Sequence, residues 1–367
     1  MRPLEGLTVI AIEQAVAAPF ATCRLADAGA RVIKIERPEG DFARGYDDVA
    51  RGQSSYFVWL NRGKESRVLD LASPEGKSAL ADLLAGADVL VQNLKRGALG
   101  RLGFPPERLA RDYPRLISCA ISGYGEDGPM ADRKAYDLLI QSETGLCSIT
   151  GGPEEPARVG ISIVDIATGA TAHAAILEAL IQRGITGKGT QIAISMFDVM
   201  ADWLTVPLMN HEGGKGPKRI GMRHPSIAPY GVFTSRDGQQ ILISVQSDRE
   251  WRKLAELFLE APELGRDPRL ATNLARVANR DLTDAMLSAA FASTDAAAAI
   301  DLLIRADIAF ANVNDMAGLS RHPHLRRIRV ETEAGPVSYP APAAQFAGQD
   351  RHYGPVPALP NSHKRPT

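Results

Sequence analysis

The sequence predicts an α/β fold, in which a large domain contains a mostly parallel sheet and a smaller domain is α+β. Three observations carry this prediction. In the first 200 residues, apolar β-branched segments alternate with helix-like segments, and this order builds a doubly wound parallel sheet. Beyond residue 225, two apolar segments flank a short turn and are followed by helices. The chain has 367 residues, enough for about two domains with separate cores.

The first unit of the expected sheet spans residues 7–36 and has the order strand, helix, strand. Residues 8–12 are apolar and largely β-branched, a helix is expected at 19–28, and residues 31–36 alternate toward an acidic end. Gly29 suits the end of that helix. Because parallel strands end at one edge of a sheet, ligands are expected at the carboxyl ends of the strands.

The same alternation continues to residue 195. The expected elements are a helix at 74–85, a strand at 88–91, a helix near Pro106, a strand at 116–121, a strand at 158–164, a helix of about 17 residues to Arg183 closed by Gly184, and a strand at 191–195. Asp165 stands where the expected helix that runs to Arg183 begins. Its ordinary role there would be to cap the helix, whereas at the edge of a sheet the same carboxylate could be a nucleophile. Position alone leaves both roles open.

A change of composition near residue 200 predicts the domain boundary. Residues 211–217 are rich in Gly with Lys, so 201–225 are expected to connect two domains. Beyond them, a hairpin around Asp237 and Gly238 precedes expected helices at 249–259 and 281–291.

These boundaries give a large domain of residues 1–200 and a small domain of residues 226–324. The C-terminal segment 325–367 is expected to join the large domain. Its tail from Val337 is rich in Pro and Ala and has weak periodicity, so we expect it to wrap over a part that is already folded.

Composition and charge exclude several classes of protein. Hydrophobic residues make up 45% and charged residues 23%, which excludes disordered and fibrous chains. With 42 Lys and Arg against 43 Asp and Glu, the formal charge of -1 offers no long-range field for nucleic acid or an anionic membrane. We therefore expect neither as a partner, and any anion must be held by local contacts.

The remaining features predict a cytoplasmic protein. Cys23, Cys119 and Cys147 are too far apart for a disulfide framework or a Cys-based metal site, which fits a reducing compartment. Residues 1–14 carry an acidic residue within what would be the apolar region of a signal peptide. No segment reaches the ~18 to 20 apolar residues of a membrane span, because even the Ala-rich segment 166–181 contains Thr, His and Glu.

Familiar catalytic motifs are absent or incomplete. Residues 14–19, in the turn after the first strand, have none of the glycines of a dinucleotide-binding loop, so NAD is not expected. Residues 184–190 contain Gly and Lys as in a phosphate-binding loop, but they follow a helix and precede a strand, the reverse order. His322 and His324 lack a nearby Cys or carboxylate at ligand spacing, so we predict no metal.

Several short segments lie in the same order as those of a known family over nearly the whole chain. They are residues 2–7, 29–38, 40–41, 61–64, 91–93, 123–125 with 128–129, 136–137 and 165–169. Together they resemble the class III CoA-transferases, the family of formyl-CoA transferase, the carnitine and bile-acid CoA-transferases and the α-methylacyl-CoA racemases. The resemblance implies a Rossmann-like large domain, a small domain and an interlocked homodimer. It also implies coenzyme A as cofactor, in the form of an acyl-CoA donor, and a free carboxylic acid as acceptor.

The resemblance also implies a set of CoA contacts. The aligned residues are Ala15, Val16, Ala17, Arg37, Leu69, Asn93, Leu94, Ala98, Arg101, Leu102, Lys134, Ala135, Tyr136 and Met196. Arg37, Arg101 and Lys134 suit phosphate groups, although each taken singly would more often be a solvated surface charge. The formyl-CoA branch has a glutamine at the position of Val16, and here its role is either vacant or taken over by nearby Gln14.

The reaction implied is CoA transfer through Asp165, which aligns with the nucleophile of formyl-CoA transferase. It would pass through a mixed anhydride and an aspartyl-CoA thioester, and backbone N–H groups at the helix start could steady the oxyanions. The racemases instead use a His-Asp pair, and here Tyr136 replaces that histidine; a phenol with a pKa near ~10 is a poor base. An acyl-CoA racemase or epimerase is the alternative. A non-catalytic CoA-binding subunit would have no need for Asp165.

Two segments bear on the acyl group. Residues 13–19 and 223–231 resemble the branch that handles C4 and C5 dicarboxylates such as mesaconate, itaconate, citramalate, malate and succinate. Arg223 and His224 could hold a distal carboxylate, because a guanidinium binds it with two hydrogen bonds. The alternative is a loop arginine and a capping histidine. Which acid is donor and which is acceptor, and whether transfer is intramolecular, are left open.

Overall fold

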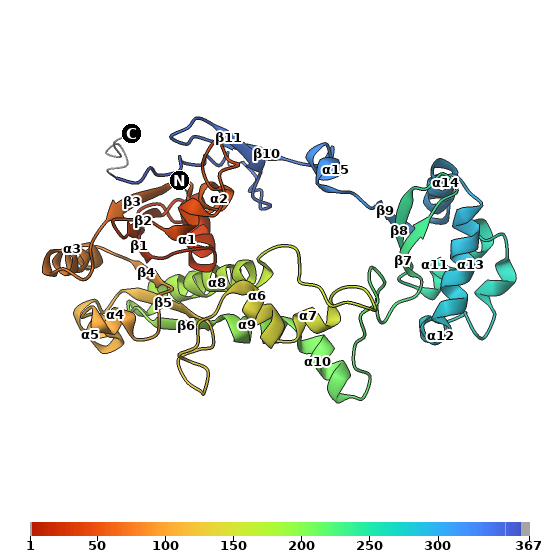
Figure 1. Cartoon of the computed structure of the whole chain (residues 1–367), viewed down its shortest axis with the longest axis horizontal. Coiled ribbons are helices and arrows are strands. Elements are labelled where there is room, and N and C mark those ends of the chain that lie inside the picture. The colour runs from red at the N-terminus through yellow and green to blue at the C-terminus, as the bar shows by residue number, and fades with distance from the viewer. Residues whose placement is uncertain (1, 349, 361–367) are drawn as a thin grey trace. The chain divides into compact units, whose positions relative to one another are not determined.

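The computed structural model describes residues 2–348 and 350–360 and divides into two compact units (Figure 1). Unit 1 consists of the described residues of Met1–Leu146, Arg158–Met209 and Arg326–Thr367. Unit 2 consists of Cys147–Ala157 and Asn210–Leu325. The chain therefore crosses from one unit to the other four times.

Unit 1 is built on a six-stranded parallel sheet with the strand order β3-β2-β1-β4-β5-β6. Its strands are β1 (Thr8–Ile12), β2 (Arg31–Glu36), β3 (Lys64–Val68), β4 (Val89–Gln92), β5 (Ile117–Ser122) and β6 (Gln191–Ser195). This is the order of a doubly wound, Rossmann-like sheet, in which the direction of the crossovers changes between β1 and β4. The predictions of β1, β2 and β6 are confirmed to the residue, and those of β4 and β5 are displaced by one residue.

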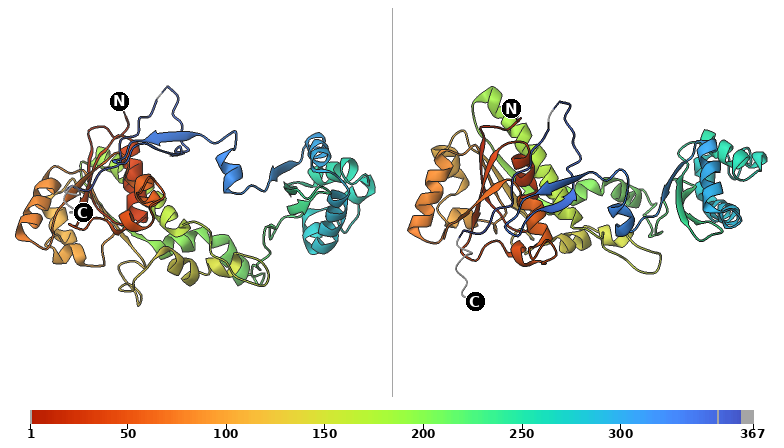
Figure 2. Two further views of the ribbon diagram at one scale, coloured as in Figure 1. Left: turned by 45° about the horizontal axis from the view of Figure 1, so that its top comes forward. Right: turned by 90° about the horizontal axis from the view of Figure 1, so that it is seen from above.

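Helices cover both faces of this sheet (Figures 1 and 2), because successive strand residues point to opposite sides. On one face, Val9 and Val91 belong to a core shared with α1 (Ala17–Asp27) and α8 (Ile163–Thr186). On the other face, Ile10 packs in a core that includes Leu80 of α3 (Pro74–Ala85) and Leu109 of α5 (Pro106–Asp112). The sheet is thus buried on both sides, as its apolar strands predict.

Helix α8 is long and apolar enough to cross a membrane, but it is a core helix. Val164, Ala172 and Ile176 are completely buried in unit 1. The helix crosses α1 at close range, since a Cβ on Gly169 would lie only 2.5 Å from the carbonyl oxygen of Ala17. The glycine therefore permits the packing that buries α8.

Two predictions around α8 are wrong. Residues 158–162 form no strand, and the β-branched run enters the helix at Ile163. The N–H of Val159 donates to the Oε1 of Gln141, at 2.9 Å, and not to a neighbouring strand. A short apolar run is compatible with both structures, so its composition could not decide between them. The helix also continues through Gly184 and ends at Thr186, where Gly187, with a φ of 72°, caps it.

Other elements of the first 212 residues were not predicted. They are η1 (Phe42–Gly45), α2 (Ser55–Asn61), β3, α4 (Ala98–Arg101), α6 (Asp137–Glu143), α7 (Leu146–Ile149), α9 (Met196–Trp203) and α10 (Thr205–Glu212). Strand β3 escaped detection because it is an edge strand with the polar sequence KESRV. Helix α10 and the end of α9 occupy part of the segment 201–225 that composition predicts as a connection.

The C-terminal segment packs onto the rest of unit 1. Strands β10 (Arg327–Val330) and β11 (Val337–Pro340) form an antiparallel pair. Further along, Val356 is buried with Phe57 and Val58 of α2, and the N–H of Gly63 donates to the carbonyl oxygen of Pro355 at 2.8 Å.

Unit 2 is a small α+β unit built on an antiparallel sheet of β7, β8 and β9. Its elements are β7 (Tyr230–Thr234), β8 (Gln240–Ser244), α11 (Asp248–Leu257), η2 (Pro262–Gly265), α12 (Asn273–Ala278), α13 (Arg280–Ala292), α14 (Ala296–Ala306), β9 (Ala309–Asn312) and α15 (Met316–Ser320). The expected hairpin turns at Gly238, where φ is 83°. Trp251, Leu287 and Phe291 are fully buried in the core of this unit.

Candidate active site

A cleft of about 560 Å³ opens at the carboxyl ends of β1, β2 and β3 and beside the segment that follows β4. Ligands of doubly wound sheets bind at this edge. Seven of the residues that the resemblance assigns to CoA or substrate line it, namely Gln14, Arg37, Leu69, Leu94, Ala98, Arg101 and Leu102. Arg37 and Arg101 are exposed and the three leucines are half-buried, so the cleft offers both cations and aliphatic surface.

The other assigned residues of unit 1 do not line this cleft. Val16, Ala17 and Met196 are buried, with relative exposures of 3%, 3% and 7%. Lys134 and Tyr136 are exposed in the segment before α6, and Ala135 between them packs against Gly123, where a Cβ would meet that of Ala135. The structure therefore brings about half of the unit 1 residues that the resemblance assigns to CoA or substrate together in this cleft.

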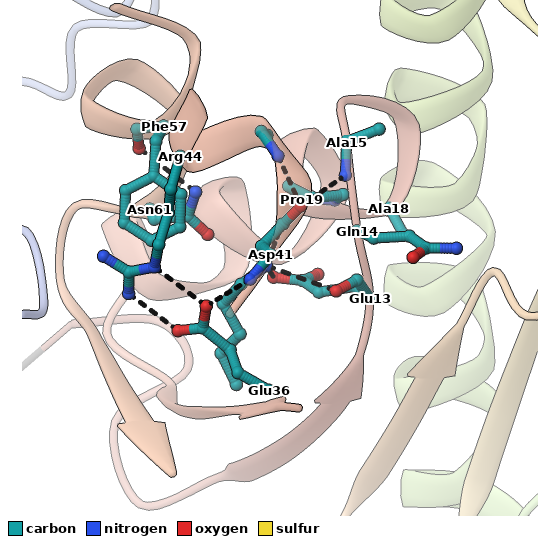
Figure 3. A network of polar contacts seen from close by, with 12 residues as sticks. Glu13, Gln14, Ala15, Ala18, Pro19, Glu36, Asp41, Arg44, Phe57 and Asn61 are labelled. Atoms are coloured by element: carbon teal, nitrogen blue, oxygen red, sulfur yellow. Dashed lines mark hydrogen bonds and ion pairs between the residues drawn. The ribbon is translucent and has the colours of Figure 1, made fainter. Parts of the chain in front are cut away.

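The turn after β1 is held from two sides. Asn93 accepts a hydrogen bond from the N–H of Gln14 at 3.0 Å and donates to its carbonyl oxygen at 2.8 Å. The N–H of Ala15 donates to the Oδ1 of Asp41 at 3.2 Å. Ala15 has a φ of 63°, an unfavourable value for a residue with a Cβ. These side chains hold a turn that has no glycine to relax it, and the side chain of Gln14 points away from the charged groups (Figure 3).

A cluster of buried charges lies behind this turn. Lys34 donates to the Oδ2 of Asp41 at 2.8 Å, and Lys64 donates to the Oε1 of Glu13 at 2.6 Å. The side chains of Lys34, Lys64 and Glu13 are fully buried. Burial alone would lower the pKa of Lys34, but Glu13 and Asp41 raise it above its ordinary value, so this lysine stays charged.

Glu36 extends the charged cluster to the wall of the cleft. Its carboxylate accepts hydrogen bonds from the guanidinium of Arg44, at 2.9 and 2.7 Å, and from the N–H of Asp41 at 2.8 Å (Figure 3). Burial opposes ionisation, but Arg44, Ser66 and Lys34 together lower the pKa of Glu36 to about 2. Glu36 is therefore an ion at physiological pH.

Asp165 lies in the first turn of α8, as its third residue, and not at the end of a strand. It does not cap the helix, because Asp137 does so. The Oδ1 of Asp137 accepts from the N–H of Val164 at 2.8 Å and from that of Asp165 at 3.3 Å. The next N–H, that of Ile166, donates to the carbonyl oxygen of Ser162. The helix start therefore offers no free N–H at these positions, contrary to the oxyanion role expected for them.

The carboxyl group of Asp165 has an unusual protonation equilibrium. Burial and, to a smaller degree, the like charge of Asp137 raise its pKa to about 7. Asp137 is itself held by a hydrogen bond from the Nε2 of Gln141, at 2.7 Å. The two carboxyl groups thus share a half-buried site without a cation among the described residues.

Tyr46 was missed by the sequence analysis. Burial, followed by the carboxylates of Asp41 and Asp165, raises the pKa of its phenol to about 12. Its ring contacts those of Phe42 and Tyr56, with centroids 5.7 and 5.6 Å apart. The phenol of Tyr46 therefore lies close enough to both Asp41, beside the cleft, and Asp165 to interact electrostatically with each. Its only sequence signal is its position shortly after the matched segment 40–41.

Arg223 and His224 begin a tightly held loop in unit 2. Arg223 lies 3.5 Å from the carboxylate of Asp284 and is 39% exposed at its side chain. His224 stacks on Tyr230, and its Nδ1 accepts from the N–H of Ser226 at 3.1 Å. Burial and Arg280 lower the pKa of His224, so the imidazole is neutral and serves as an acceptor.

Side chains from α12 and α13 hold the backbone of the same loop. Arg280 donates to the carbonyl oxygens of His224 and Ile227, at 2.7 and 3.0 Å. The fully buried Arg276 donates to the carbonyl oxygen of Ala228 at 2.6 Å. In the described part of the chain, no group of three or more His, Cys, Asp or Glu side chains could hold a metal ion.

Comparisons with known proteins identify the chain. The family model described as CoA-transferase family III matches residues 4–363. An acetyl-CoA:oxalate CoA-transferase of Acetobacter aceti is 38% identical over 352 residues, which cover 95% of this chain and 90% of that protein. A succinate–glutarate CoA-transferase of Agrobacterium fabrum is 40% identical over 288 residues, covering 76% of this chain and 72% of that protein.

Solved structures agree with the sequence comparisons. A CaiB/BaiF family protein from Brucella suis matches with a TM-score of 0.82 at 36% identity, and the match covers 98% of this chain and 96% of that one. These likenesses define the class of protein as an enzyme that transfers CoA between carboxylic acids. The chain belongs to CoA-transferase family III.

Proposed function

We propose that Asp165 is the nucleophile of CoA transfer and that the cleft beside β1, β2 and β3 holds the CoA moiety. The observation that carries the proposal is the state of Asp165. Its carboxylate is half-buried beside Asp137, and no cation or hydrogen-bond donor among the described residues pairs with it. A buried carboxylate without a partner costs stability, so reactivity explains it better than folding does.

The reaction proceeds from the ionised form of Asp165. Its carboxylate attacks the thioester carbon of the donor, the C–S bond breaks, and CoA leaves as a thiolate with the electron pair. The thiolate attacks the aspartyl carbonyl of the mixed anhydride, which releases the donor acid and forms an aspartyl-CoA thioester. The acceptor carboxylate then displaces the thiolate, and the thiolate attacks the acceptor's carbonyl. The product is the new acyl-CoA, and the carboxylate of Asp165 is restored.

Replacement of Asp165 tests the nucleophile. Asp165→Ala should abolish transfer while CoA binding and folding stay nearly unchanged, and hydroxylamine added with an acyl-CoA donor should inactivate the wild-type enzyme by trapping the acylated residue. Asp198→Asn is the matched control, because Asp198 is an exposed aspartate at the same position of the first turn of α9. An unmodified Asp165 peptide after hydroxylamine treatment, or more than a few per cent of residual turnover in the alanine variant, would remove Asp165 from this role.

The acids transferred are proposed to be C4 or C5 dicarboxylates. The names of the relatives support a dicarboxylate. Glutarate, and mesaconate in a relative from Haloarcula hispanica that is 32% identical, are C5 diacids, whereas the oxalate of the Acetobacter aceti relative is a C2 diacid. Arg223 is the proposed anchor for the distal carboxylate. Because Arg223 lies beside Asp284, the substrate would have to share or displace that carboxylate.

A substrate panel tests the dicarboxylate proposal. The enzyme is incubated with succinyl-CoA and free diacids, and the CoA esters formed are identified by mass. Arg223→Met should reduce kcat/KM for diacids by about one to two powers of ten and that for a monocarboxylic acid of similar length much less. Asp284→Asn is the complementary variant, and it should lower the KM for diacids by freeing Arg223. Equal losses for both acids in Arg223→Met would make Arg223 structural.

The functional enzyme is proposed to be an interlocked homodimer, as in the family that the chain belongs to. Linked chains must unfold to separate, so light scattering should give a dimer from micromolar down to nanomolar concentrations. A monomer that appears on dilution would contradict the linked arrangement.

A further inference from the structure

The last described residues of the chain pack beside the cleft of unit 1. We refer to residues 353–360 as the C-terminal strap. The strap is fixed at its start by the buried Val356 and by the hydrogen bond from Gly63 to Pro355. Gly354 approaches Gly63 so closely that a Cβ on Gly354 would lie 2.8 Å from the Cα of Gly63. The strap is therefore built into unit 1 and does not lie loosely on its surface.

Arg44 connects the strap to the wall of the cleft. Its guanidinium donates to the carbonyl oxygen of Pro357 at 3.4 and 3.3 Å and forms a double hydrogen bond with Glu36. The guanidinium also lies 3.7 Å from the centroid of the Phe57 ring, which supports it from one side (Figure 3). The planar fork of arginine suits this position, because it can hold a carboxylate and a carbonyl at once.

The contacts continue from Glu36 to the turn after β1. Glu36 accepts a hydrogen bond from the N–H of Asp41, and the carboxylate of Asp41 accepts one from the N–H of Ala15. Glu36 and Asp41 therefore connect Arg44 to this turn through hydrogen bonds. Residues 36–41 all line the cleft, and Arg37 among them is the proposed phosphate ligand. From the strap, Leu359 contacts the same segment at Gly40, where a Cβ would lie 3.4 Å from its methyl groups. The strap thus supports one wall of the cleft at two points.

We propose that Arg44 is a positioning residue for CoA binding, through which the C-terminal strap fixes the wall 36–41 and the turn at Ala15. This inference rests on the proposed use of the cleft for CoA. Arg44 itself does not line the cleft. Its effect is preorganisation: a wall that is already in place loses less freedom when the ligand binds.

The test measures CoA affinity by titration calorimetry, together with KM, kcat and Tm, in the full-length enzyme. Arg44→Gln should raise the Kd for CoA roughly five- to fiftyfold, which lies within the range of about 5- to 150-fold that is typical of coupling between two sites. Arg44→Lys keeps the charge without the fork and should be intermediate, and Leu359→Ala should give a smaller rise. Arg51→Gln is the matched control, because Arg51 also binds a carbonyl of the C-terminal segment, that of Pro336 at 2.9 Å, but does not line or adjoin the cleft wall.

The outcomes separate the two proposals. If calorimetry detects no binding of CoA to the wild-type enzyme, the proposed function of the cleft fails. If the wild type binds CoA but Arg44→Gln and Leu359→Ala bind it equally well, or if Arg51→Gln loses as much affinity as Arg44→Gln, the positioning role of Arg44 is wrong. A lower Tm with unchanged Kd would likewise show that Arg44 only stabilises the fold. If the double variant Arg44→Gln with Leu359→Ala loses less CoA affinity than the two single variants combined, both residues act on the cleft wall through the same contacts.

Discussion

Two irregular backbone segments, the turn at Ala15 in unit 1 and the loop that follows Arg223 in unit 2, are held in place by different kinds of contact. In unit 1, buried acids and bases of opposite sign pair side chain to side chain, as Lys34 does with Asp41 and Lys64 with Glu13. In unit 2, Arg276 and Arg280 donate mainly to backbone carbonyl oxygens.

The difference lies in what a substitution leaves behind. Removal of one member of the unit 1 cluster leaves a whole charge uncompensated in the interior. Removal of Arg276 in unit 2 leaves carbonyl dipoles without donors, and the one carboxylate that it also binds, Asp248, is 42% exposed and keeps its contact with water, so the loss costs less. We therefore expect substitutions in the unit 1 cluster to lower the free energy of unfolding and the activity more than substitutions of Arg276 or Arg280 in unit 2.

Lys34→Met should produce the largest loss of stability. It leaves Asp41 and Glu13 with one cation fewer in a fully buried place, which costs about 3–5 kcal/mol. Urea unfolding followed by circular dichroism measures the loss. Arg31→Met is the control, since the Arg31–Glu65 pair is about half exposed, with side-chain exposures of 53% and 49%. Similar losses for both variants would contradict the contrast between buried and exposed pairs.

Arg276→Leu should have a smaller effect. The carbonyl oxygens of Ala228 and Leu270 lose their donor, and each unsatisfied carbonyl costs about 1–3 kcal/mol if water cannot reach it. Hydrogen exchange should show faster exchange around residues 224–229 while the sheet of unit 1 stays protected. A loss as large as that of Lys34→Met would show that the two regions do not differ as described.

Asp165→Asn should stabilise the protein slightly, because Asp165 lacks the partners that both other regions have. Its pKa of about 7 in the folded state lies above the ordinary value of 3.8, so the proton is bound more tightly in the folded state. Stability linked to this group is therefore lost as the pH rises from about 4 to 7. The Tm gain of the variant, about 2–4 °C, should be present at pH 8 and absent near pH 4. A Tm that falls at pH 8 would show hidden partners of Asp165.

Asp137→Asn should shift the pH dependence of transfer. If the ionised Asp165 is the nucleophile, kcat/KM rises with pH through about 7. Asparagine keeps an oxygen to accept the N–H of Val164 but removes the like charge, so the pKa of Asp165 falls and the rising limb moves to lower pH by less than about one unit. An unmoved limb would mean that burial alone sets the pKa of Asp165.

The fold could be predicted from sequence where a local pattern was sufficient. Strands β1, β2 and β6 are β-branched segments between clear breaks, and the sequence marks their ends. The same reasoning failed at residues 158–164, because a β-branched run says nothing about whether a neighbouring strand exists to pair with it. It also missed β3, in which Lys64 points a charge into the interior to meet Glu13.

The site could be predicted only in part. A family resemblance located Asp165 and the cleft residues such as Arg37, since these lie in matched segments. The buried cluster was invisible, because Glu13, Lys34 and Lys64 are spread over 51 positions with no common period. The capping role passed from Asp165 to Asp137 for a similar reason: the two residues are 28 positions apart, and only the tertiary fold places one at the helix start of the other.

Because the chain crosses between the units four times, each unit is assembled from segments that are far apart in the sequence. A single cut by trypsin after Lys215, which lies in an exposed stretch, would give fragments 1–215 and 216–367. The first fragment contains residues 147–157, which belong to unit 2 and contact Arg219 and Gly221 there. The second contains the strap, which belongs to unit 1. Each fragment thus completes a unit begun by the other, and the nicked protein should stay in one piece until one of the two cores melts.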